Sequence, residues 1–114
     1  VEVFLNIYKY NIIIFKYLNN IMDVVISNIF NDIVYLKNKE ITISIMCQRI
    51  FYYIQEYLKP TKHSEKDILN ISCHVADIIE YNLNKLEEDN KLIYMNIKEI
   101  FKLINDIIYE SKIV

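Results

Sequence analysis

Residues 64–81 read SEKDILNISCHVADIIEY, and this stretch decides the fold class. Ser64 can accept hydrogen bonds from the first free amides of a helix, and Asp67 can reach back to the backbone, so residues 64–67 form a capping-box pattern. Behind this pattern, apolar and small side chains recur at a spacing that places them on one helical face. These side chains are Ile68, Ile71, Ser72, Val75, Ile78 and Ile79. We predict a helix over residues 67–81 and expect it to be the central helix of the fold, with Ile71, Val75 and Ile78 deeply buried.

Helical periodicity also marks the chain that precedes this segment. An apolar cluster near the start predicts a short first helix. Its members are Val3, Phe4, Ile7 and Tyr8. The apolar run over residues 18–34 predicts one long helix, or two consecutive helices with a break at residues 28–31.

The segment before Pro60 allows two interpretations. Residues 41–45 are rich in β-branched side chains and would suit a strand, but Thr42 and Ser44 are natural helix N-caps. Helix is preferred because the periodic pattern that follows, up to Leu58, is longer than the ambiguous part. Pro60 should end this helix, since a residue before proline is pushed out of the α region.

The last third of the chain predicts an amphipathic helix after an acidic turn at residues 87–90. Its apolar stripe comprises Ile93, Ile97, Ile100, Phe101, Ile104, Ile107 and Ile108. The sequence therefore predicts an all-α fold: one domain over residues 1–114, built as a compact bundle of six to seven helices around a central helix.

Composition narrows the class further. The chain of 114 residues contains no Gly, which tight β-hairpins nearly always need. Gly, Pro, Ala and Arg, whose codons are GC-rich, are absent or occur once, so an AT-rich gene such as that of a virus or an intracellular parasite is indicated. The net charge is −2 and the Lys residues are scattered, which argues against nucleic-acid binding. Residues 11–30 are apolar but carry interrupting Lys, Asp and Asn, so no membrane span is expected.

No catalytic or metal-binding constellation is evident, so we expect no enzymatic activity, cofactor or metal. His63 and His74 lack ligand partners at helical spacing, and Cys47 is too isolated for a disulfide framework. Cys73 and His74 are adjacent, and adjacent helix residues point about 100° apart, so they do not form a nucleophile and base pair. The ten Tyr residues favour a protein interface, but an AT-rich gene produces the same enrichment.

The second half of the chain resembles the poxvirus Bcl-2-like proteins. In that family a central helix of the form seen in DILNISCHVADII, residues 67–79, is followed by an acidic turn and a helix of the IKEIFKLIND type, residues 97–106. The similarity covers residues 58–108, starting at Leu58-Lys59-Pro60. It implies a virus-encoded protein in the host cell cytoplasm that suppresses innate signalling to NF-κB or interferon regulatory factors by binding host proteins.

The resemblance also implies two candidate surfaces. Many family members form homodimers through their first and sixth helices. The corresponding dimer-face candidates are Phe4, Ile7, Tyr8, Ile97, Phe101 and Ile104. Some members instead bind death-motif helices in an apolar groove to block apoptosis, with a cation that meets the Asp of the ligand. The groove candidates are Met46, Arg49, Ile50, Phe51, Ile54, Lys66 and Val75.

The chain departs from the groove-binding members at one point. Those members carry an Asn-Trp-Gly-Arg signature where the central helix begins, whereas this chain contains neither Trp nor Gly, and only Lys66 offers a cation there. Signalling inhibition is therefore the favoured function. A groove-type apoptosis inhibitor is the first alternative, and a helical assembly subunit of the histone-fold type is the second.

Overall fold

The computed structural model describes residues 20–111, with side chains from Val24 onward. This part of the chain contains four α-helices and one short 3-10 helix: α2 (Asn20–Lys37), α3 (Ile43–Leu58), α4 (Glu65–Glu88), η1 (Leu92–Tyr94) and α5 (Ile97–Glu110). No strand occurs within it. The all-α class is confirmed, but the six to seven helices are not, and the predicted first helix lies outside the described residues.

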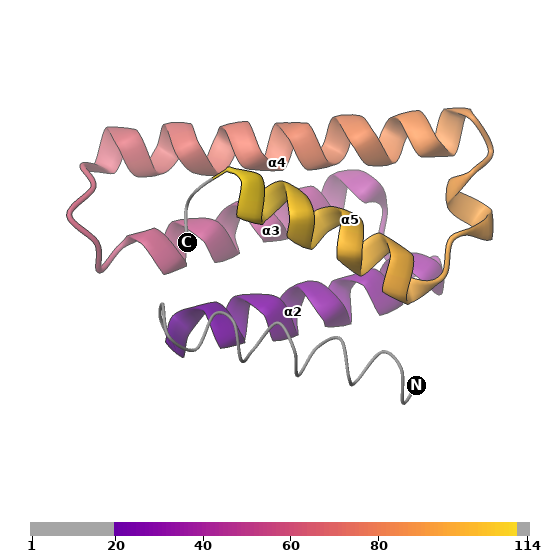
Figure 1. Cartoon of the computed structure of the whole chain (residues 1–114), viewed down its shortest axis with the longest axis horizontal. Helices are drawn as coiled ribbons and strands as arrows, with labels where there is room; N and C mark the ends of the chain where they lie inside the picture. The colour runs from indigo at the N-terminus through magenta and orange to yellow at the C-terminus, as the bar shows by residue number, and fades with distance from the viewer. Residues whose placement is uncertain (1–19, 112–114) are drawn as a thin grey trace.

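Successive helices run in opposite directions and form a four-helix bundle (Figure 1). Helix α3 lies beside α2 and α4, and α5 lies beside the same two helices, so that in this part of the chain α2 and α4, and likewise α3 and α5, lie across the bundle from each other. Short connections between helices favour such antiparallel neighbours. The helices therefore form a ring around one apolar interior.

Helix α4 is longer than predicted and is not a central helix. It has 24 residues, where residues 67–81 were expected. It lies along one edge of the bundle (Figure 1) and exposes the face that carries Leu69, Asp77 and Tyr81. Because charged and polar side chains line that face, the described helices cannot surround α4 without desolvating them. The described residues therefore do not confirm the predicted central position.

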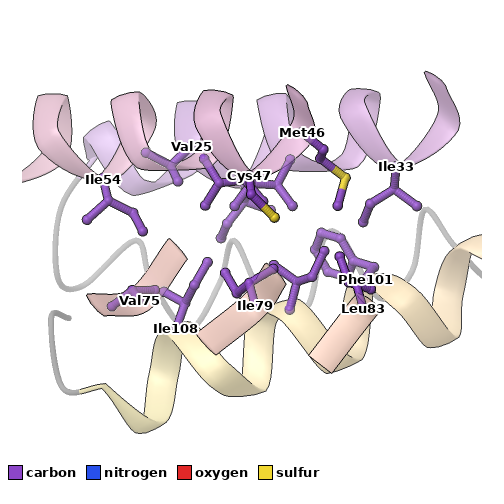
Figure 2. Packing of buried hydrophobic residues seen from close by; sticks show 14 of the residues in the cluster. Val25, Ile33, Met46, Cys47, Ile54, Val75, Ile79, Leu83, Phe101 and Ile108 are labelled. Atoms are coloured by element: carbon purple, nitrogen blue, oxygen red, sulfur yellow. The ribbon is translucent and has the colours of Figure 1, made fainter. Parts of the chain in front are cut away.

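The core lies between a layer made by α2 and α3 and a layer made by α4 and α5 (Figure 2). Met46 and Ile54 point into it from one layer, and Ile79, Leu83 and Phe101 meet them from the other. All five are at most 1% exposed. A single continuous core therefore holds the described helices together.

The buried face of α4 is rotated relative to the prediction. Val75 is buried as expected, but Ile71 and Ile78 are only half-buried. The deepest apolar positions are Ile79 and Leu83, both 0% exposed like Ser72 of the same helix. Adjacent helix residues point about 100° apart, so Ile78 lies at the edge of the face that Ile79 centres. In the same way Leu92 is buried while Ile93, which was assigned to the apolar stripe, is exposed.

The predicted helix starts are largely confirmed. Thr42 Oγ1 accepts a hydrogen bond from the Ile45 amide at 3.2 Å, so the segment with β-branched residues begins a helix. Ser64 Oγ accepts from the Asp67 amide at 3.1 Å, which is the Ser64 half of the predicted capping box. A complete capping box, not predicted, starts α5, where Asn96 Oδ1 accepts from the amide of Glu99 and Glu99 Oε1 from the amide of Asn96.

One helix is confirmed as continuous, and one helix end differs in detail from expectation. Helix α2 continues through residues 28–31, so the single long helix is the alternative that the structure shows. Helix α3 ends at Leu58 as predicted, but Lys59 stays in the α conformation and its amide donates to the Gln55 carbonyl. The helix stops there because Pro60 has no N–H to continue the hydrogen-bond ladder, not because Lys59 leaves the α region.

Neighbouring isoleucines on α4 provide a test of this packing. We expect Ile79→Ala to lower the free energy of unfolding by about 2–5 kcal/mol, because the site is fully enclosed and a cavity would remain. Ile78→Ala removes the same atoms from a half-buried position, so its cost should be clearly smaller. Urea denaturation of both variants measures the difference, and equal costs would contradict the observed rotation of α4.

Candidate protein-binding surface

The predicted groove is filled by the core of the chain itself. Met46, Ile50 and Ile54 are 0% exposed and Val75 is 1% exposed. These side chains pack against α2 and α5 within the continuous core (Figure 2). A ligand helix would therefore have to displace part of the bundle before it could reach them.

Neither of the two cations assigned to the groove is positioned to bind the Asp of a ligand helix there. Arg49 Nη1 lies 3.1 Å from Asp32 Oδ1, so the guanidinium is already paired within the chain. Lys66 is exposed in the first turn of α4. Phe51, the remaining groove candidate, is half-buried and stacks edge-on against Tyr52, with ring centroids 5.7 Å apart.

Asp32 is a buried carboxylate that the sequence did not single out. It is 2% exposed, and both of its oxygens have partners on α3: Arg49 donates to Oδ1, and the Tyr53 hydroxyl donates to Oδ2 at 2.6 Å. A buried charge is tolerated only when it is paired and hydrogen-bonded, as here. Burial, followed by the hydrogen bond to Asp32, raises the pKa of Tyr53, so the hydroxyl remains a donor above the pH at which an ordinary tyrosine ionises.

The dimer-face candidates on α5 belong largely to the core. Phe101 is 1% exposed and Ile104 is 0% exposed, and Ile97 is half-buried. The Phe101 ring meets Phe30 of α2 edge-on, with centroids 6.5 Å apart. Phe4, Ile7 and Tyr8 lie outside the described residues. The α5 part of the predicted face is therefore interior to the chain.

The candidate chemical groups are scattered over the described residues. The imidazole Nδ1 of His63 lies 2.7 Å from the Thr61 hydroxyl in the loop after α3. His74 borders a hollow between α4 and α5, and Cys73 Sγ lies 3.7 Å from Asp77 Oδ2 on the exposed face of α4. Within residues 20–111 no group of three His, Cys, Asp or Glu side chains could hold a metal ion. In the same part of the chain, no helix is long and apolar enough to cross a membrane.

Cys47 is enclosed in the core, and its environment disfavours the thiolate. Burial, followed by the nearby carboxylates Glu80 and Asp77, raises the pKa of this thiol to about 12. A thiol reacts as its thiolate, so Cys47 is protected in the folded chain. Cys73 is exposed.

A surface that combines hollows with exposed apolar side chains lies at one end of the bundle. Two adjacent hollows, of about 290 Å³ and 500 Å³, share Leu36, Lys39 and Glu87. The first extends to Leu92 and Ile93, and the second extends along the start of α3. We call the surface formed by these hollows and by the neighbouring Tyr94 the end surface. Its lining comprises Leu36, Lys37, Lys39, Ile41, Thr42, Ile43, Ser44, Asn84, Glu87, Asn90, Leu92 and Ile93.

Two side chains project from the end surface. Ile93 is 67% exposed and Tyr94 is 85% exposed. The Lys37 ammonium donates to the Ile93 carbonyl at 3.3 Å and so joins the end of α2 to η1. Aromatic and aliphatic side chains beside an apolar hollow are the usual anchors of protein interfaces. The arrangement suits the binding of a partner protein through a few side chains.

The end surface forms where α2 and α4 both end, and each helix is followed by a residue in the left-handed backbone conformation. Lys39 has φ 60° and Asn90 has φ 57°, where Gly is usually found. Each lies in a Schellman motif, in which the Glu40 amide donates to the Tyr35 carbonyl and the Lys91 amide donates to the Leu86 carbonyl. A chain without Gly thus still makes sharp helix ends, at a cost of about 1–2 kcal/mol for a residue such as Lys39.

Sequence reasoning missed this surface because no single motif marks it. The left-handed residues are a Lys and an Asn, and Ile93 and Tyr94 look like the start of the α5 stripe. The available signal was the pair of Gly-free loops at residues 38–42 and 89–91, which are five and three residues long. The pairing of α3 with α4 and of α2 with α5 brings these loops together.

Comparisons with known proteins identified no relative. No protein family, no characterised protein and no solved structure matches the chain.

Replacement of the Arg49 guanidinium tests whether the ion pair with the buried Asp32 stabilises the fold. We expect Arg49→Met to cost about 3 kcal/mol of stability at neutral pH, because the buried carboxyl group of Asp32 would lose its ionic partner. The partial exposure of Arg49 places the effect at the low end of the range for buried pairs. Lys59→Met, which breaks the exposed pair with Glu56, is the matched control and should change stability by about 0–1 kcal/mol. Similar losses in the two variants would refute the role.

The two cysteines should differ in reactivity and in their effect at high pH. A thiol reagent should modify Cys73 in the folded chain and Cys47 only after unfolding. Since the pKa of Cys47 is about 12 in the folded chain and the ordinary pKa of a cysteine thiol is 9.0, the thiol of the unfolded chain ionises first. Stability from this group is therefore present below pH 9 and is lost as the pH rises toward 12.

Cys47→Ala should flatten this decline in stability between pH 9 and pH 11, apart from a constant packing loss. Cys73→Ala serves as the control and should leave the slope unchanged. Equal labelling of both thiols in the folded chain, by mass spectrometry, would contradict the burial of Cys47.

Proposed function

We propose that this chain is a virus-encoded protein that binds host signalling proteins through its end surface and thereby inhibits innate immune signalling in the NF-κB or interferon pathways, without catalysis. The observation that carries the proposal is the exposure of Ile93 and Tyr94 beside two apolar hollows, while the alternative groove is occupied by the core. The host cell cytoplasm is the compartment in which such targets lie.

The viral source and the class of target rest on the sequence resemblance of residues 58–108 to the poxvirus Bcl-2-like proteins and on the AT-rich composition. The proposal includes a Bcl-2-like bundle of six to seven helices over the whole chain and a homodimer. A homodimer would need a face other than Phe101 and Ile104, since both side chains are inside the core.

The groove-type apoptosis inhibitor is the weaker candidate. Four of its five apolar groove residues, all except Phe51, are buried, and its main cation is bound to Asp32. A death-motif peptide would have to displace α2 and break this pair, so we expect affinities at the micromolar level or weaker, roughly −8 kcal/mol at best. No feature of the described residues favours the histone-fold assembly subunit over these two.

A substitution on the end surface tests the proposed function in cells. Expression of the chain should lower the output of an NF-κB or interferon-pathway reporter, and Ile93→Asp should remove most of this effect, because a charge in the centre of an interface is costly to desolvate. Leu69→Asp places the same charge at another exposed aliphatic position, 50% exposed at the start of α4, and should retain inhibition.

Both variants should unfold at temperatures close to that of the unmodified chain, which separates loss of binding from loss of folding. Full inhibition by Ile93→Asp would exclude the end surface as the binding site. Nanomolar binding of several death-motif peptides, measured by calorimetry on the purified chain, would instead make apoptosis inhibition the leading function.

A further inference from the structure

Tyr94 differs from the other tyrosines of the described residues in both exposure and backbone. It is 85% exposed, more than any other large apolar or aromatic side chain in that part of the chain. It ends the three-residue helix η1, and the next two residues, Met95 and Asn96, are extended. Tyr81 and Tyr52 are also well exposed, at 69% and 63%, but each lies inside a long α-helix.

Backbone accessibility matters because a modifying enzyme must draw the tyrosine and its neighbours into a cleft. At Tyr94 this requires the loss of two backbone hydrogen bonds, from the Tyr94 amide to the Lys91 carbonyl and from the Met95 amide to the Leu92 carbonyl, both at 3.1 Å. At Tyr81 it requires opening several turns of α4, a much rarer local unfolding event.

The surroundings of Tyr94 also suit an added anion. In a 3-10 helix side chains three residues apart are eclipsed, which places Lys91 on the same side as Tyr94. Lys37 is held at the adjacent Ile93 carbonyl. The amino end of α5 at Ile97 is already capped by Asn96 and Glu99. A phosphate on Tyr94 would therefore be added on the side of η1 that carries Lys91.

We propose that Tyr94 is a phosphorylation site for a protein tyrosine kinase. The Tyr94 Oη attacks the γ-phosphorus of ATP, the bond from that phosphorus to the β–γ bridging oxygen breaks, ADP leaves, and the phenol proton passes to the catalytic aspartate of the kinase. The product carries a dianionic phosphate at the rim of the end surface. This inference concerns the same surface as the proposed function but does not depend on it.

The test uses the purified full chain with MgATP and a tyrosine kinase of broad specificity, in the absence of any host partner. We expect the initial rate of phosphorylation at Tyr94, measured by quantitative mass spectrometry, to exceed the rates at Tyr81 and Tyr52 by about tenfold or more, because the helical sites need local unfolding first. Tyr94→Phe should remove this leading signal, and Tyr81→Phe should leave it unchanged.

A proteolytic digest of the same chain serves as a control, since the peptides that contain Tyr81 and Tyr94 no longer differ in fold. The advantage of Tyr94 should shrink in the digest. Equal rates at Tyr94 and Tyr81 in the folded chain, or no phosphate on Tyr94, would overturn the inference. Because no signalling protein is present, these outcomes are independent of whether Ile93→Asp affects the reporter.

Discussion

The carboxylate of Asp32 is the constraint on which much of the arrangement depends. A charge that is 2% exposed requires full pairing, and the two groups that supply it, Arg49 and Tyr53, lie one turn apart on α3. This fixes the rotation of α2 against α3. With α2 in that position, the apolar face of α3 is covered, and side chains that might have lined a ligand groove become the interior of the bundle.

Because the bundle is closed, the residues of the predicted groove are buried, and the hollows suited to binding lie at the end surface instead. Helices α2 and α4 stop at the same end, each in a left-handed residue, and the short connections that follow leave two hollows between them. Leu92 anchors the connection in the core, and this anchor holds Ile93 and Tyr94 outward. The exposed side chains are thus a consequence of helix termination in a chain without Gly.

The same connection combines well-defined flanks with a short turn, which suits both the proposed recognition and the proposed modification. It is joined to α2 by Lys37 and is followed by the complete capping box of α5, so the backbone around it is defined. Only two backbone hydrogen bonds close η1 itself. A surface that combines fixed flanks with a short, easily opened turn can serve a binding partner and an enzyme in turn.

The sequence by itself determined the helical class, the start of α3 at Thr42, its end before Pro60 and the start of α4 at Ser64, because caps and proline act through bonds within a few residues. It also located the apolar stripe of α5, of which Phe101 and Ile104 are the centre. The sequence could not show that these two side chains face the core of the same chain, since a periodic pattern identifies an apolar face but not the element that packs against it.

Only the tertiary structure decided which helices are neighbours. The pairing of α2 with α5 and of α3 with α4 placed α4 at the edge, rotated its buried face from Ile78 to Ile79, and buried Asp32 beside Arg49. Each of these features depends on contacts between residues far apart in the chain. Small differences in the apolar area buried by adjacent helix faces determine how a helix is rotated, and local periodicity does not reveal such differences. For that reason the groove was predicted from the sequence and the end surface was not.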